Sequence, residues 1–303
     1  MIRAKRRIKH WLTFRFITSL ILLFNFLSRG DAIVLGKVLG RWAFFLQKDA
    51  RRTTLRNLKF ALGKIKKERE IKKIAWQTFE NIGKNIADVA RFPKLTLSEV
   101  DRIVQAEGLK HLDTAYKRGK GVIVLTGHIG NFELIGAYLS LKGYKISAVG
   151  RDVYDPRLNK LLIRNRESVG VENISSTGDV KKIIKVLRAG RTLGVLADQD
   201  STRVKGTFVN FFGKAARTPV GPAFLNLKLG SPIIPMALLR NKNEKYKIIV
   251  KPALELQPTG DKSRDVKDLT QKYTEVLEKI IREYPSQWVW MHKRWKSRPA
   301  SSG

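Results

Sequence analysis

The chain has 303 residues, and its 60 lysines and arginines against 26 aspartates and glutamates give it a formal net charge of +34. Its hydrophobic fraction of 43% is enough for a folded core, which excludes a disordered tail. The absence of cysteine excludes disulfides, thiolate nucleophiles and cysteine metal sites. We expect no metal site, because the four histidines lack a zinc-binding spacing.

The strong positive charge favours an anionic partner, which can be nucleic acid, acidic lipid headgroups or an acidic protein. The alternative is a lysine-rich surface that only aids solubility. The imbalance is far larger than the modest net charge of a typical small domain, so an anionic partner is the preferred interpretation.

Two apolar stretches near the N-terminus predict membrane-associated helices. The first, residues 11–27, follows basic residues within 3–9 and is at the lower length limit of a transmembrane helix. The second, residues 32–46, carries Lys37 and Arg41 on one face, which is typical of an interfacial amphipathic helix. Because both flanks are basic, a monotopic hairpin is preferred over a single short span. A cleaved signal peptide is a weaker alternative, since an arginine interrupts its cleavage site.

The rest of the chain predicts an α/β fold. A polar, basic helical zone over residues 48–92 ends at Pro93. Strands are then expected at 121–127, 145–150, 192–197, 232–239 and 246–254, and helices at 131–142, 156–168, 178–189, 218–229 and 264–284. This alternation predicts a mostly parallel or mixed central sheet flanked by helices. We expect an anchor over residues 1–47, one catalytic domain over 48–299 and a tail over 300–303.

The most informative motif lies where the first of these strands ends. His128 and Glu133 are separated by a short segment that contains Gly130 and Asn131. Residues five apart in one helix lie on different faces, so the two side chains can meet only if a strand stops, a turn follows and a helix begins. A histidine held by a carboxylate is a ready general base. The alternative is a capping or structural histidine.

Further polar residues follow the next two strands. Arg151 comes after the second strand, and the segment from Asp198 to Asp200, which includes Gln199, comes after the third. Ligands of such sheets bind outside the carboxyl ends of the strands, so these side chains are expected near His128.

The segment Gly127-His-Ile-Gly-Asn-Phe-Glu-Leu-Ile135 closely resembles a motif of the late acyltransferases of lipid A biosynthesis, the lauroyl/myristoyl transferase family of Gram-negative bacteria. Further segments resemble other blocks of that family, in the same order along the chain. The arginine block is resembled by residues 148–151 and 155–159, and the following Arg-x-x-x-Gly block by 166–170. The central blocks are resembled by 196–200, 208–213, Ala216 and 218–223, and the C-terminal signature by 288–295. The resemblance covers nearly the whole chain, and several ordered blocks are more specific than one His-x4-Glu spacing.

The resemblance implies a glycerolipid-acyltransferase-like fold and an enzyme at the cytoplasmic face of the inner membrane. The expected reaction moves a fatty acyl group from acyl carrier protein, or from acyl-CoA, to a hydroxyl of a lipid A precursor. The expected partners are therefore acyl carrier protein, an anionic glycolipid acceptor and membrane lipid, with no nucleic acid and no cofactor. No covalent acyl-enzyme is expected, because the chain has neither a cysteine nor a G-x-S-x-G elbow.

On this hypothesis His128 removes the proton from the acceptor hydroxyl, and Glu133 fixes its tautomer. Backbone N–H groups near Gly130 and Asn131 are candidates for binding the oxyanion, although Asn131 is better explained as a helix N-cap.

Four further residues are expected to bind substrate. Arg151 and Arg166 are candidates for holding a phosphate or carboxylate, against the alternative of solvated surface arginines. Asp198, with Gln199 beside it, is a candidate for orienting Arg151 or a substrate hydroxyl, against the alternative of a cap or loop salt bridge.

Three interpretations remain open at this stage. The first is the lipid A acyltransferase. The second keeps the chemistry but changes the acceptor to another glycolipid or a phospholipid. The third is a basic nucleic-acid-binding protein, although the chain lacks a P-loop, an RNP-like aromatic motif and zinc-finger spacing.

Overall fold

The computed structural model describes residues 2–153, 155–175 and 180–299, apart from the side chains of residues 2–9. The basic side chains within 3–9, the start of the helix expected at 178 and the tail at 300–303 therefore lie outside the described residues. The N-terminal helices are α1 (Ile2–Phe26), α2 (Arg29–Leu46), α3 (Lys48–Leu62) and α4 (Glu68–Ala90), followed by a 3-10 turn (Phe92–Lys94).

The chain after the first 3-10 turn alternates strands and helices. In chain order these are α5 (Leu97–Ile103), β1 (Val104–Glu107), α6 (Leu109–Lys117), β2 (Val122–Thr126), α7 (Phe132–Leu141), β3 (Ile146–Gly150), α8 (Pro156–Glu167), β4 (Glu172–Ser175), α9 (Val180–Arg188), β5 (Thr192–Leu196), β6 (Gly206–Phe211), β7 (Lys214–Pro219), α10 (Gly221–Leu229), β8 (Ile233–Arg240), β9 (Tyr246–Val250), α11 (Lys262–Glu283) and a second 3-10 turn (Pro285–Gln287).

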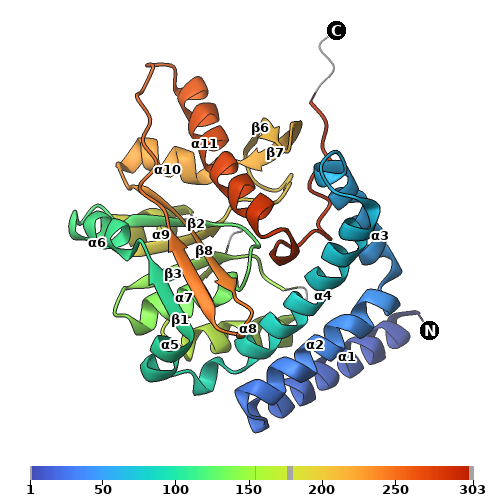
Figure 1. Ribbon diagram of the computed structural model, residues 1–303. Helices are drawn as coiled ribbons and strands as arrows, with labels where there is room; N and C mark the ends of the chain where they lie inside the picture. The colour runs from blue at the N-terminus through green and yellow to red at the C-terminus, as the bar shows by residue number, and fades with distance from the viewer. Residues whose placement is uncertain (1, 154, 176–179, 300–303) are drawn as a thin grey trace.

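The described strands form a seven-stranded mixed sheet in the order β1-β9-β8-β2-β5-β3-β4 and a separate β6-β7 hairpin (Figure 1). Neighbouring strands of the large sheet are parallel except β8 and β9, which are antiparallel. The predicted α/β class with a mostly parallel or mixed sheet between helices is therefore confirmed.

Strand β2 shows why the core forms on both faces of the sheet. All five of its residues are buried, and successive side chains of a strand point to opposite faces. Val122 and Val124 pack with apolar residues of α5, α6 and α7. Ile123 and Leu125 pack on the other face with residues of α9, α10 and α11. A strand covered on both faces needs a continuous apolar run, and this run is what predicted the strand.

The N-terminal helices pack beside this core, where α1 and α2 lie side by side and α2 packs along α4 (Figure 1). Small residues allow this close packing. A Cβ on Gly36 would come within 2.5 Å of the backbone oxygen of Gly83, and one on Gly40 within 2.3 Å of that of Phe79. The two backbones therefore approach too closely for any larger residue at these positions.

Within the described residues, no helix combines the length and the apolar character that crossing a membrane requires. Helix α2 nevertheless exposes a row of large apolar side chains to solvent, namely Val34, Val38, Trp42, Phe45 and Leu46. Helix α1 exposes Trp11, Leu12, Phe16, Leu22, Leu23 and Phe26. Together these residues are the exposed apolar surface of α1 and α2.

The expected strands and helices are present, with ends shifted by a few residues. The sequence did not predict the two edge strands β1 and β4 or the β6-β7 hairpin. Strand β1 exposes all of its residues but the first, and β4 has only one buried residue. Short polar edge strands lack the apolar run that marks central strands.

Candidate active site

The site is built where the neighbouring parallel strands β2 and β5 end. Thr126 of β2 is in register with Leu196 of β5, so the chain segments that follow them leave the sheet side by side. The Oδ1 atom of Asp198 lies 2.8 Å from Nδ1 of His128. Its Oδ2 atom accepts the backbone N–H of His128 at 2.7 Å. Parallel pairing thus brings together two residues that are 70 positions apart.

Asp198 is a buried carboxylate with a full set of partners. Its side chain is 1% exposed, and Trp288 Nε1 donates to its Oδ2 atom at 2.7 Å. Burial disfavours the ionised carboxylate, but the His128 ring and these hydrogen bonds outweigh burial and hold the pKa of Asp198 below its ordinary value. A Cβ on Gly127 would lie 3.0 Å from the carboxylate, so the small residue before His128 leaves room for this contact. The carboxylate is therefore ionised and rigidly placed.

The ring of His128 is fixed by this carboxylate. Because an ionised carboxylate only accepts hydrogen bonds, the Nδ1 atom of His128 must carry the proton, which leaves Nε2 as the acceptor. The ring also packs edge-to-face on Phe132, with centroids 4.9 Å apart. A histidine whose ring is oriented by a buried carboxylate is the arrangement of a general base.

The predicted contact between His128 and Glu133 is wrong. The predicted strand, turn and helix are all present, since β2 ends at Thr126 and α7 begins at Phe132. However, the carboxylate of Glu133 pairs with the guanidinium of Arg166, at 2.5 and 2.9 Å. The first turn of α7 points Glu133 toward α8, whereas His128 leaves the strand toward β5. The carboxylate that contacts His128 is that of Asp198.

In the turn between His128 and α7, the backbone N–H groups that were expected to be free already have acceptors. The N–H of Gly130 donates to the backbone oxygen of Gln287 at 2.7 Å, and that of Asn131 donates to Leu238 at 2.9 Å. The expectation that these two N–H groups bind an oxyanion is therefore wrong. Gly130 has φ +57, and a Cβ there would meet the Leu238 oxygen at 1.9 Å. Glycine is required by the backbone at this position.

Asn131 is a buried N-cap. Its side chain accepts the N–H of Leu134, and its Nδ2 donates to the hydroxyl of Tyr246 at 3.0 Å. The capping interpretation is confirmed, and the role of Asn131 in substrate binding stays a prediction.

The two arginines expected to bind substrate lie in different surroundings. Arg166 is buried in α8, and besides Glu133 it donates to Asn173 at 2.5 Å. Its guanidinium thus bridges α7, α8 and β4. Arg151 is exposed just after β3 and contacts neither His128 nor Asp198. The expectation that Asp198 orients Arg151 is therefore wrong, and substrate binding by either arginine stays a prediction.

Gln199 and one unpredicted residue complete the site. The Nε2 atom of Gln199 lies 2.9 Å from Nε2 of His128 and 2.7 Å from Nε2 of His292. Burial of the His292 ring, with His128 beside it, lowers the pKa of His292 to about 4. No role for His292 was predicted, although it lies in the C-terminal block at 288–295 that marks the family resemblance.

His128 opens onto a cavity of about 610 Å³. Its lining is mostly apolar and comes from α1, α4, α8 and the C-terminal segment, with Ile17, Leu20, Ile82, Ile86, Leu158, Leu161, Leu162 and Met291 among the residues. A cavity of this size with a mostly apolar lining and a few polar groups is typical of a small-molecule or lipid site. Apart from His128, the polar groups include Asn81, Asn85, Asn165 and Gln287.

Comparison with models of known protein families identifies the family of this chain. The model of the bacterial lipid A biosynthesis acyltransferase family matches residues 3–297. The chain belongs to this family. It is therefore an enzyme of the acyltransferase class, and the interpretation as a nucleic-acid-binding protein is not supported.

Individual members and relatives of the acyltransferase family show where the similarity lies. The chain is 26% identical over 301 residues to the lipid A biosynthesis lauroyltransferase of Escherichia coli. This match covers 96% of this chain and 93% of that protein. It is 24% identical over 302 residues to the palmitoleoyltransferase of the same organism, with the same coverage. It is 28% identical over 226 residues to the phosphatidylinositol mannoside acyltransferase of Mycobacterium tuberculosis, covering 72% of this chain and 69% of that protein.

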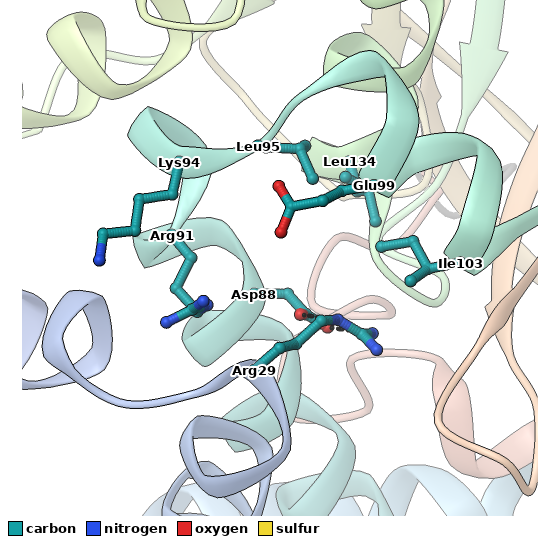
Figure 2. Close-up of a pocket in the computed structure, with 8 residues that line it drawn as sticks. All are labelled: Arg29, Asp88, Arg91, Lys94, Leu95, Glu99, Ile103 and Leu134. Atoms are coloured by element: carbon teal, nitrogen blue, oxygen red, sulfur yellow. Dashed lines mark hydrogen bonds and ion pairs between the residues drawn. The ribbon is translucent and has the colours of Figure 1, made fainter.

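A second, much smaller cavity of this acyltransferase lies between α2, α4 and α5 (Figure 2). Its volume of about 20 Å³ suits a water molecule and no larger ligand. Arg29 Nε pairs with Asp88 there at 2.9 Å, and Arg240 pairs with the other oxygen of the same carboxylate at 2.8 Å. Two arginines on one buried carboxylate tie α2 and β8 to α4, so this cluster stabilises the fold beside the active site.

Proposed function

We propose that this acyltransferase moves a fatty acyl group from acyl carrier protein to a hydroxyl of a lipid A precursor, with His128 and Asp198 as its general-base pair. The observation that carries the proposal is the 2.8 Å contact between Nδ1 of His128 and the buried carboxylate of Asp198. It leaves Nε2 of a cavity-lining histidine as the proton acceptor.

The chemistry needs only side chains of this chain and no cofactor. Nε2 of His128 takes the proton of the acceptor hydroxyl as the oxygen attacks the thioester carbonyl. The new C–O bond forms, the C–S bond breaks, and the imidazolium returns the proton to the departing thiolate. Asp198 stabilises the transient imidazolium through Nδ1. Direct transfer is favoured because the chain has no cysteine for a thioester intermediate.

The apolar cavity supports a fatty acyl chain as one ligand. Side chains of α1, α4 and α8 form its walls, and His128 lies among its lining residues. An acyl chain buried there would hold its thioester carbon near the general base, and apolar burial would supply the binding free energy.

The identity of the acceptor has a second candidate. The named relatives include lipid A acyltransferases matched over nearly their whole length and phosphatidylinositol mannoside acyltransferases matched at slightly higher identity over a shorter segment. Acyl transfer to a glycolipid hydroxyl is common to both names. We therefore propose the lipid A precursor as the first acceptor to test and a mannosylated phosphoinositide as the second.

The charge of the chain supports an acidic donor protein and a phosphorylated acceptor. A net charge of +34 steers anionic partners toward the enzyme and makes their association sensitive to salt. Acyl carrier protein is the preferred donor for this reason, with acyl-CoA as the alternative.

The exposed apolar surface of α1 and α2 supports association with the cytoplasmic face of the inner membrane. Trp42 is 60% exposed and Phe16 is 64% exposed, although burial of large apolar side chains is the favoured state. Helices α1 and α4 also contribute to the wall of the apolar cavity. Docking this surface on lipid would place the cavity close to its substrates.

The catalytic proposal is tested with purified enzyme, labelled acyl carrier protein and either acceptor in mixed vesicles. We expect acylated lipid product with the unchanged protein and none above background with His128→Ala. His111→Ala, in α6 and away from the cavity, is the matched control and should keep activity. Full activity of His128→Ala would refute the general-base assignment, and transfer only to the second acceptor would reassign the substrate.

Vesicle flotation tests the membrane proposal. The double variant Phe16→Ser/Trp42→Ser should bind anionic vesicles at least about tenfold more weakly, because two large apolar side chains no longer enter the lipid. Val180→Ser, at an exposed position of α9, is the control. Equal binding of all three proteins would refute docking through α1 and α2.

A further inference from the structure

Asp198, the carboxylate that holds His128, is itself held by a side chain of the C-terminal segment. Its Oδ1 atom lies 2.8 Å from Nδ1 of His128, and its Oδ2 atom accepts the backbone N–H of the same residue at 2.7 Å. The indole N–H of Trp288 donates to that second oxygen, also at 2.7 Å. Donors from two different segments thus hold Oδ2, and the orientation they impose keeps Oδ1 directed at the histidine ring.

The indole of Trp288 is fixed by its packing. The side chain is buried, and its ring packs edge-to-face against Trp290 and Phe211, with centroids 4.6 and 5.6 Å away. A close-packed ring of this size cannot turn without displacing its neighbours. An indole N–H only donates hydrogen bonds, and a buried one needs an acceptor, which is the carboxylate of Asp198.

The backbone on both sides of Trp288 is paired with the turn that carries His128. The N–H of Gly130 donates to the backbone oxygen of Gln287 at 2.7 Å, and the N–H of Val289 donates to the backbone oxygen of His128 at 3.1 Å. Trp288 lies between these two bonds, in an antiparallel bridge with the turn. The segment that carries the indole and the turn that carries the imidazole are therefore held in one register.

We propose that Trp288 is a positioning residue of the acyl transfer reaction, whose indole N–H orients the Asp198 carboxylate toward the ring of His128. The inference rests on the proposed function. Trp288 exchanges no proton in the reaction. It acts only through Asp198, which must keep Oδ1 on Nδ1 of His128 while the ring takes the proton of the acceptor hydroxyl and carries a positive charge.

A neutral donor suits this task better than a charged one. A lysine or an arginine in the same place would neutralise the carboxylate and weaken its attraction for the imidazolium, whereas an indole leaves the negative charge in place. The bond also helps to keep that charge inside the protein. Burial raises the pKa of Asp198, but the contacts with His128 and the bond from Trp288 outweigh burial and hold the pKa below its ordinary value.

Trp288→Phe tests the positioning role, because it keeps an aromatic ring and removes the N–H. We expect kcat of acyl transfer to fall about 10- to 100-fold, the effect of one hydrogen bond to a charged group, while KM for donor and acceptor stays within about threefold. Trp290→Phe is the matched control, since Trp290 is buried in the same segment but donates its indole N–H to the backbone oxygen of Pro285 at 2.6 Å. Its kcat should stay within about threefold of the unchanged protein, although denaturant unfolding should show lost stability in both variants.

The double variant Asp198→Asn/Trp288→Phe separates a positioning role from a structural one. Once the carboxylate is gone, Trp288→Phe should lower kcat by less than about twofold further, because the group through which it acts is missing. If Trp288→Phe is not folded, benzothienylalanine at position 288, with sulfur in place of the indole N–H, carries the same test. An undiminished kcat, an equal loss in Trp290→Phe or an additive loss in the double variant overturns the positioning role. Absence of lipid acylation by the unchanged protein refutes the proposed function instead.

Discussion

Two carboxylates lie near the turn that carries His128, and they differ in what they hold. Asp198 is 1% exposed, comes from the neighbouring strand end and holds the histidine. Glu133 is 20% exposed, lies in the first turn of α7 and holds Arg166. The difference teaches that the carboxylate partner of His128 is chosen by the direction in which each backbone leaves the sheet. Closeness in sequence does not decide it.

Replacing Asp198 should have the largest effect. We expect Asp198→Asn to lower kcat by about 10³- to 10⁴-fold, because an amide oxygen no longer stabilises the imidazolium and an amide N–H favours the wrong tautomer. Steady-state acyl transfer measures this, with circular dichroism as the check on folding. A variant that retains more than a tenth of the activity would show that the carboxylate only supports the fold.

Replacing Glu133 should affect the fold more than the chemistry. Glu133→Gln leaves the buried guanidinium of Arg166 with a neutral partner, and we expect a loss of about 2 kcal/mol in the free energy of unfolding. This is below the cost of breaking a fully buried pair, because Glu133 keeps some contact with solvent. Denaturant unfolding gives the value, and Glu133→Gln/Arg166→Gln tests the coupling. A 10³-fold loss of kcat at unchanged stability would show that Glu133 acts in the reaction.

The pH dependence of stability should reveal the neutral His292. The pKa of His292 is about 4 in the folded protein and about 6.5 when unfolded, so the unfolded chain binds more protons between these values. Stability from this group is therefore lost as pH falls from about 6.5 toward 4, by about 2 kcal/mol between pH 7 and 5.

Comparison of the unchanged protein with His292→Phe isolates this contribution, because the other titrating groups near it, His128 and Asp198, are common to both proteins. The variant should lose less stability than the unchanged protein over the same pH interval. Equal losses in the two proteins would contradict a neutral buried His292.

The smallest expected effect belongs to the helix start between the two carboxylates. Asn131→Ala removes the cap of α7 and the bond to Tyr246, and we expect a loss of about 1 kcal/mol with kcat nearly unchanged. Thermal unfolding together with acyl-transfer kinetics tests this. A raised KM for the acceptor at unchanged stability would instead support Asn131 as a substrate-binding residue.

Local patterns explain how much of this fold could be predicted. The apolar run at 121–127 became β2, and the small residues before Phe132 became the turn that ends in α7. The polar edge strands β1 and β4 could not be predicted, since only their neighbours in the sheet define them.

The residues of the candidate site can likewise be divided into those that local patterns predicted and those that they did not. His128 and Asp198 were both selected because they follow strands, but the sequence assigned the carboxylate role to the nearer Glu133. The order β8-β2-β5-β3 makes β5, and not β3, the neighbour of β2 on that side, which pairs His128 with Asp198 and leaves Arg151 apart. His292 lies 164 positions from His128 and has no local signal of its role; only its family block marked it.

The sequence by itself determined the central strands and the helices, the turn, the family and the histidine, because each depends on residues that are neighbours along the chain. The tertiary structure alone decided which carboxylate holds that histidine, which amide lies beside its ring and which helices line the apolar cavity. These contacts join residues from separate strands and helices, and their geometry depends on the order of strands in the sheet, which no local pattern encodes.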